Sequence, residues 1–214
     1  MAVQTAETSV WDPFVRLAHW IIAVAFFVAY LTEDDVLSVH VWAGYVVGAL
    51  VLLRIAWGLV GPRYARFSDF IYAPHKIVTY LTDLLRLRAP RYLGHSPAGG
   101  AMVVALLLCL ALTVATGLVV YAEEEGAGPL ASLYSQAAVS SQPSAGAIES
   151  SEERQEGDER EGDGQESAFK DVHELLANIT LALVVLHVVG VVLASLAHHE
   201  NLARAMVTGR KRAH

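Results

Sequence analysis

The chain has 214 residues, of which 54% are hydrophobic and 17% are charged, and its formal net charge is −7. The apolar residues form long unbroken runs, which is the composition of a membrane protein and argues against a soluble acidic one. The single cysteine, Cys109, excludes a disulfide framework and a thiolate metal site.

Four apolar runs are long enough to cross a bilayer as helices. They cover residues 14–31, 39–60, 100–122 and 172–197. A spanning helix needs about 20 apolar residues, because backbone polar groups find no water in the hydrocarbon core. We therefore predict an all-α fold, a four-transmembrane-helix bundle forming one domain over residues 1–214. The first run is interpreted as a retained helix, since Glu7 and Asp12 precede it and no small-residue cleavage site follows it.

The charges between the runs predict how the chain crosses the membrane. Arginine and lysine gather between the second and third runs and again in the tail 209–212. By the positive-inside rule these segments face the cytoplasm of a bacterial inner membrane. Both termini are then cytoplasmic, and the acidic segments 33–35 and 123–171 are periplasmic. The segment 70–87 has an apolar helical face and charges elsewhere, which predicts a helix on the cytoplasmic membrane surface.

The segment 123–171 is rich in Glu, Asp, Ser and Gly. This composition buries too little apolar surface to offset the entropy of ordering the chain, so we expect most of the segment to be disordered. It is interpreted as a solvated spacer or, alternatively, as an acidic docking patch for a basic periplasmic partner. The sequence does not separate these two interpretations.

Four histidines lie inside the apolar runs, where ionisable side chains are costly and usually functional. His19 follows the cytoplasmic start of the first run, and His40 follows the periplasmic start of the second. In the fourth run, His173 lies at the periplasmic entry and His187 lies 14 residues, or about 21 Å, deeper. Fourteen residues are almost four helical turns, so His173 and His187 share one helix face to within about 40°.

Depth pairs His40 with His173 near the periplasm and His19 with His187 nearer the cytoplasm. Two imidazoles from facing helices are a standard way to hold a haem iron in a bundle, so the pattern favours two b-type haems. A lone histidine on an apolar face is more often structural. A di-metal transport site is the main competitor, but it needs carboxylates at the same depth. The other histidines are assigned to the surface: His75, His95, His198, His199 and His214.

Two arginines are candidates for binding a haem propionate. Arg54 lies 14 residues after His40, on nearly the same face and at the depth of the cytoplasmic pair. Arg16 lies one turn before His19, and a positive-inside anchor explains it equally well. Glycines inside the runs are candidates for packing beside a haem, with ordinary small-residue helix packing as the alternative. They are Gly44, Gly48, Gly117 and Gly190.

Four stretches carry a family resemblance. They are VWDPFVRLAHW at 10–20, HVWAGY at 40–45, GHSPAGGAM at 94–102, and His173-Glu174 together with His187. They resemble the bacterial cytochrome b561 and nickel-iron hydrogenase cytochrome b family, over nearly all of the chain except the acidic segment. The resemblance implies a four-helix membrane cytochrome with two b haems, held by His19, His40, His173 and His187. The acidic insertion departs from the shortest members and leaves the periplasmic partner unassigned.

The resemblance implies an electron-transfer subunit that links a periplasmic redox protein, such as a c-type cytochrome or a hydrogenase, to membrane quinone. A self-contained superoxide:quinone oxidoreductase is the second hypothesis, and a haem-free transporter or metal carrier is the third. We assign no catalytic residue, because the sequence has no Gly-rich phosphate loop, flavin motif, paired cysteines or catalytic triad. Nucleic-acid binding is not expected, since topology explains the basic residues. The sequence leaves the oligomeric state open.

Overall fold

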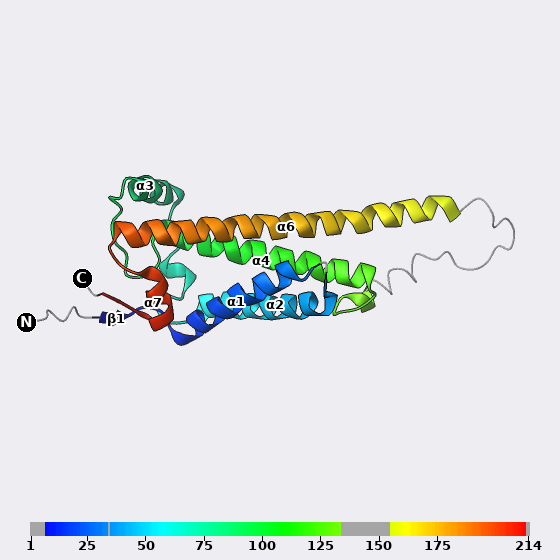
Figure 1. Ribbon diagram of the computed structural model, residues 1–214, viewed down its shortest axis with the longest axis horizontal. Helices are drawn as coiled ribbons and strands as arrows, with labels where there is room; N and C mark the ends of the chain where they lie inside the picture. Colours follow the sequence, from blue (N-terminus) through cyan, green and yellow to red (C-terminus); the bar gives the residue numbers. More distant parts are fainter. Residues whose placement is uncertain (1–6, 34, 134–154, 213–214) are drawn as a thin grey trace, which may run out of the picture. The chain divides into compact units, whose positions relative to one another are not determined.

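The computed structural model describes residues 7–33, 35–133 and 155–212 (Figure 1). The elements in chain order are β1 (Glu7–Ser9), α1 (Pro13–Leu31), α2 (Leu37–Val60), η1 (Phe67–Asp69), α3 (Pro74–Leu85), α4 (Pro97–Glu124), α6 (Gln155–Ala197), α7 (Leu202–Thr208) and β2 (Arg210–Arg212). Apart from the pairing of β1 with β2, the described elements are helical. The predicted all-α fold is confirmed.

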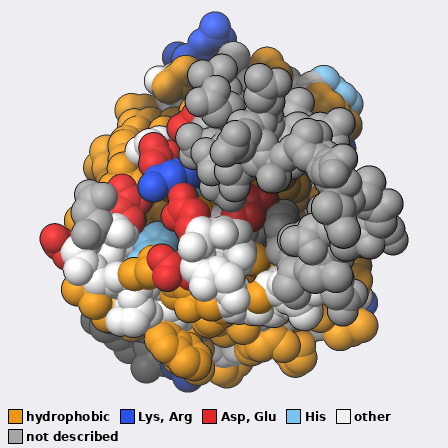
Figure 2. Space-filling model, turned by 90° about the vertical axis from the view of Figure 1, so that its right-hand side faces the viewer, with side chains coloured by type: hydrophobic (Ala, Val, Ile, Leu, Met, Phe, Trp, Pro, Cys, Tyr) orange, Lys and Arg blue, Asp and Glu red, His pale blue; other side chains and the backbone are white. Residues whose placement is uncertain are grey.

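Four of the described helices are long and apolar enough to cross a membrane: α1, α2, α4 and the part of α6 from Ala168 to Ala197. Their large apolar side chains point outward, and Leu17, Trp42 and Leu52 are 63%, 70% and 69% exposed. Figure 2 shows hydrophobic side chains at the surface, with acidic ones among them. Such surface suits contact with lipid, because in water so much exposed apolar area would drive association. The four predicted spans are therefore confirmed.

The chain forms two compact units. The first comprises Met1–Ala111 and Ile179–His214, and the second comprises Leu112–Asn178. In the first unit α1 packs along α2. The buried residues at this contact are mostly small: Ala18 and Ala25 on α1, and Ala43, Val47 and Val51 on α2. Their spacings of four and seven residues place them on one face of each helix, where small side chains let two backbones approach closely.

The start of α1 is fixed by a cap. Asp12 precedes the helix, and its Oδ1 accepts a hydrogen bond from the Val15 backbone N–H at 3.0 Å. Pro13 occupies the first helical position, where its missing N–H costs nothing. The second Asp12 oxygen, Oδ2, accepts from the Trp57 indole Nε1 at 3.3 Å. One carboxylate therefore both begins α1 and ties it to α2.

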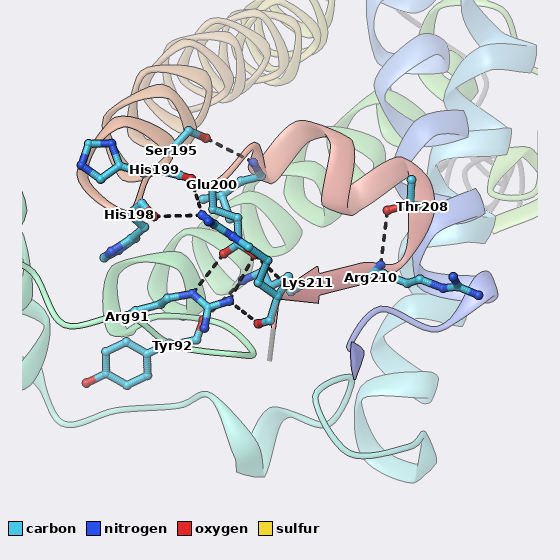
Figure 3. A network of polar contacts seen from close by, with 11 residues as sticks. Arg91, Tyr92, Ser195, His198, His199, Glu200, Thr208, Arg210 and Lys211 are labelled. Carbon is cyan, nitrogen blue, oxygen red and sulfur yellow. Dashed lines mark hydrogen bonds and ion pairs between the residues drawn. The ribbon is translucent and has the colours of Figure 1, made fainter. Parts of the chain in front are cut away.

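The two ends of the described chain are joined by a terminal clasp, which we define as β1, β2, Arg91 and Glu200. β1 and β2 are antiparallel, with Thr8 opposite Lys211. Arg91 donates from Nε and Nη2 to the two Glu200 carboxylate oxygens, both at 3.2 Å, as Figure 3 shows. The Arg212 backbone N–H also donates to Glu200 Oε1, at 3.0 Å. The clasp was not predicted, because three-residue strands leave no alternating apolar pattern.

Two further predictions concern the surface helix in 70–87 and the acidic segment 123–171. The segment 70–87 contains α3, which buries Tyr80 and Leu84 and leaves Val78 and Leu85 exposed. Its place on the membrane surface stays a prediction. The acidic segment was expected to be mostly disordered, yet α6 begins at Gln155, so residues 155–171 are helical, and residues 134–154 lie outside the described part. Extending an existing helix costs far less than starting one, and this stretch contains good helix formers such as Glu, Gln and Arg.

Gly209 should be needed for the clasp. It has a φ of +80°, and an added Cβ would lie 2.8 Å from Arg16 Nη1 and 3.0 Å from the Trp11 carbonyl oxygen. We expect Gly209→Ala to lower the free energy of unfolding by about 1–3 kcal/mol, through left-handed strain and this crowding. Thermal unfolding of the detergent-purified protein measures the effect. Arg210→Ala, at the exposed next residue, is the control; equal melting of wild type and Gly209→Ala would contradict this geometry.

The clasp should also weaken in acid. Burial raises the pKa of Glu200, but the hydrogen bonds from Arg91 and from the Arg212 backbone outweigh it and leave the pKa below 4.5. A carboxylate with a lowered pKa stabilises the fold above its unfolded pKa and loses that contribution as pH falls through its folded pKa.

We therefore expect the melting temperature to fall below about pH 4.5, near the ordinary pKa of a glutamate, and Glu200→Gln to flatten this dependence. Asp69→Asn, which removes the exposed Arg66–Asp69 pair at 3.4 Å, is the control and should keep the wild-type profile. An unchanged acid profile in Glu200→Gln would show that other groups carry the effect.

Candidate functional site

His19 of α1 and His187 of α6 meet inside the first unit. Their ring centres lie 6.3 Å apart, with the ring planes inclined by 57°. Two imidazoles that each bind the same metal ion through one nitrogen, at about 2 Å, have ring centres about 6 Å apart. The described residues contain no group of three or more His, Cys, Asp or Glu that could hold a metal ion. The geometry therefore suits a metal ion that takes two protein ligands and its remaining ligands from a macrocycle.

The surroundings of His19 are apolar. The Trp20 ring stands edge-on to the imidazole, with ring centres 5.1 Å apart. His19 Nδ1 is buried and has no hydrogen-bond partner among the described residues. Trp20 also lines an apolar groove of about 730 Å³ between α1 and α2, whose other walls include Val24 and Trp42. The hydrogen-bonding requirement of His19 Nδ1 is therefore met by no described residue.

His40, on the first turn of α2, has its ring nitrogen Nδ1 2.9 Å from the Ala29 carbonyl oxygen. A carbonyl oxygen only accepts, so Nδ1 carries the hydrogen and Nε2 keeps its lone pair. This second hydrogen bond is the usual device that fixes the tautomer of a metal-binding histidine. That His40 is a haem ligand stays a prediction.

His173 shows the same arrangement within the second unit. Its Nδ1 lies 2.9 Å from the Thr113 carbonyl oxygen and 3.2 Å from Thr116 Oγ1, both on α4. Gly117 makes this approach possible, because an added Cβ would lie 2.8 Å from His173 Cε1. Gly117 was predicted to make room for a haem; the structure places the His173 ring against it instead, and packing on a haem stays a prediction.

The other predicted positions are less constrained by contacts. His40 and His173 belong to different units, so their pairing stays a prediction. An added Cβ at Gly44 or Gly190 would meet nothing within 4 Å, which leaves open space at both. Gly48 lies one turn after Gly44 on α2 and is half-buried. Packing of these glycines against a haem remains a prediction.

Arg54 is a buried cation, with 6% of its surface exposed. Its guanidinium lies over the Phe67 ring at 5.5 Å, and its Nη1 is buried without a hydrogen-bond partner in the described part of the chain. Asp12 is the carboxylate whose charge Arg54 feels, but its oxygens already accept from Val15 and Trp57. Burial of a charge without a bonded counter-ion costs several kcal/mol, so Arg54 is evidence for an anion at this place.

Arg16 is engaged differently. Its Nη2 donates to the Val207 carbonyl oxygen near the end of α7, where the helix dipole favours a cation. Its Nε is buried and has no partner among the described residues. Arg16 therefore ties α1 to α7, and its role toward a propionate stays a prediction.

The assignment of His95 to the surface is wrong. Its ring packs against Trp11 and Phe70, with ring centres 4.6 Å and 4.4 Å away, and its Nδ1 is buried without a partner in the described chain. Burial and then the positive charges of Arg54 and Lys211 lower the pKa of His95 to about 3, against a backbone hydrogen bond at Tyr64. Its place directly before the third apolar run was the signal in the sequence.

The other histidines assigned to the surface are His75, His198, His199 and His214. His75 and His199 are exposed, as expected. His198 is half-buried, and its Nε2 lies 3.4 Å from the Tyr80 hydroxyl oxygen. His214 lies outside the described residues.

The comparisons with known proteins gave one finding. A family model described as prokaryotic cytochrome b561 matches residues 10–209. That range includes both histidines of the close pair as well as His40 and His173. No curated protein and no solved structure matches the chain.

Proposed function

The chain belongs to the prokaryotic cytochrome b561 family, and from this membership we propose that it moves electrons across the bacterial inner membrane between a periplasmic redox protein and the quinone pool. The coarser statement follows from the family alone: this is a membrane b-type cytochrome of electron transfer. The two-haem stoichiometry, the ligands and the electron partners are the proposal.

One observation carries the proposal, namely the close approach of His19 to His187. The 6.3 Å between their ring centres is the spacing of two axial ligands on one iron. When bound there, a b haem supplies one-electron oxidation and reduction at its iron. The helices hold the imidazoles at the required separation, and the apolar faces of α1 and α6 keep water away from them.

The second haem is assigned to His40 and His173. Each donates its Nδ1 hydrogen to a backbone carbonyl, of Ala29 and of Thr113 respectively, and so offers Nε2 as a ligand. His173 and His187 stand 14 residues apart on one helix, α6, which separates the two sites by depth. Two sites at different depths are what electron transfer across a membrane requires.

The arginines and glycines support haem binding in different degrees. Arg54 offers a buried, unpaired N–H group to a propionate carboxylate. Arg16 offers Nε, while its Nη2 is already used by Val207. Gly44 and Gly190 leave space in which a planar ring could lie.

A quinone partner is supported by the groove between α1 and α2. It is lined almost entirely by apolar side chains, which suits an isoprenoid tail. Trp20 lines the groove and contacts the His19 ring, so a molecule in the groove would lie close to the haem held by His19. We place this haem on the cytoplasmic side, with both termini cytoplasmic, on the strength of the charge distribution.

A periplasmic c-type cytochrome or hydrogenase-like protein is the proposed partner on the other side. The support is the acidic end of the second unit, where Glu124 and Glu125 are exposed. Glu124 has a partial partner in Lys170, with Nζ 3.8 Å from Oε1. Acidic surfaces of this kind speed the docking of basic redox proteins, and the effect weakens with salt.

The ligand assignment predicts the visible spectrum of the purified protein. The pyridine haemochrome assay should give about two b haems per chain, as expected for bis-histidine sites. His19→Ala and His187→Ala should remove or convert the same haem, and His40→Ala and His173→Ala the other. His75→Ala, at an exposed position of α3, should keep both haems. Retention of two unaltered haems in His187→Ala would contradict the pairing.

The close contact of the His173 ring with Gly117 gives a sharper test of the second proposed haem site. Gly117→Ala would place a Cβ 2.8 Å from His173 Cε1, so the ring must move and one haem should be lost or bound weakly. Thr116→Val is the matched control on the same helix turn. It removes a hydroxyl 3.2 Å from Nδ1 but leaves the Thr113 carbonyl as acceptor, so haem content should stay near wild type. A full haem complement in Gly117→Ala would show that Gly117 is not required.

A further inference from the structure

Two buried cations lie in the first unit. Arg54 and Lys211 are 6% and 7% exposed, although they come from α2 and from the terminal strand β2. Lys211 Nζ donates to the Tyr92 carbonyl oxygen at 3.4 Å and lies 5.4 Å from the centre of the Trp11 ring. The sequence assigned Lys211 only to the positive-inside tail.

Neither cation has an ion pair within 4.0 Å among the described residues. Glu200 attracts Lys211 and lies in the same cluster, but its carboxylate oxygens already accept from Arg91 and from the Arg212 backbone (Figure 3). Arg54 keeps Nη1 unpaired. Buried positive charge of this kind is costly unless an anion neutralises it, and the described residues do not supply a free negative group here.

His95 packs in the same cluster as these cations. Its ring contacts Trp11, over which Lys211 Nζ lies. It also contacts Phe70, which packs on the Phe67 ring below Arg54. Its charge interacts with that of Arg54, of Lys211 and of His187, the proposed axial ligand. Its Nδ1, like Arg54 Nη1, is buried without a partner in the described chain. An anion that neutralised these cations would lie within the first unit, which also holds His187, the proposed haem ligand.

We propose that Lys211 acts with Arg54 to bind the two propionate carboxylates of the haem held by His19 and His187. The inference rests on the proposed function, since it assumes that haem. A b haem carries two carboxylates. They equal the two buried cations in number and are opposite to them in charge. The terminal strand β2 is then part of the proposed haem site. Trp11 positions Lys211 by a cation–π contact between its ring and the ammonium group.

The test replaces the charge and keeps the shape. Lys211→Met retains the length of the stem and removes the ammonium. A positive charge near a haem favours the reduced state, so its removal should lower the midpoint potential of one of the two haems in spectroelectrochemical titration. In redox-difference infrared spectra of protein with ¹³C-labelled propionates, the carboxylate band should shift. Lys211→Arg should keep the potential near wild type.

The matched control is Arg210→Met, because Arg210 lies in the same strand with an exposed side chain. It should change neither the potential nor the propionate band. Wild-type protein with two b haems in which Lys211→Met leaves both readings unchanged would overturn this inference and leave the proposed function standing. Wild-type protein without haem would overturn both.

A second comparison covers the case in which Lys211→Met unfolds the clasp: the labelled band is also compared between wild type and Lys211→Arg. A guanidinium binds a carboxylate through two N–H groups, unlike an ammonium, and must alter the band of a carboxylate that it touches. An unmoved band in Lys211→Arg overturns the inference without any charge-removing variant.

Discussion

Inside a membrane a polar side chain must find its partner in protein or in a ligand, because hydrocarbon offers none. This constraint orders the whole structure. His40 and His173 each place Nδ1 against a backbone carbonyl, that of Ala29 and that of Thr113. Arg54 and His19 each have a buried nitrogen without a hydrogen-bond partner in the described chain. We take these unpartnered nitrogens as support for the proposed haem site.

The helices convert this local chemistry into a fixed distance. The contact of α1 with α2 is made by small residues such as Ala18 and Ala43, which hold two backbones close without polar contacts. Asp12 then sets where α1 begins, seven residues before His19. On the other side of the site, Glu200 follows the end of α6 and is held by Arg91. Polar contacts thus hold α1 at its start and the chain just after the end of α6.

The sequence predicted the four spans and the pairing of His19 with His187 in depth, because both follow from a 1.5 Å rise and an apolar run. It did not predict the burial of His95 or Lys211. Their positions depend on contacts far apart in the chain, such as Lys211 with Trp11 and His95 with Phe70, which no local pattern encodes. The helical start of α6 at Gln155 was missed because composition describes an isolated segment, whereas a helix already formed in the membrane extends cheaply into it.

The terminal clasp changes how the tail should be understood. A cationic tail is usually explained by topology alone, and the exposed Arg210 fits that explanation. Lys211, its neighbour in the same strand, points the opposite way because successive residues of a strand alternate between faces. The strand therefore presents one cation to water and buries the next beside Trp11. Lys211 and His187 belong to the same unit, so the charge that the last strand buries would act on the haem that we propose at His187, and the clasp that joins β1 to β2 would then be part of that site.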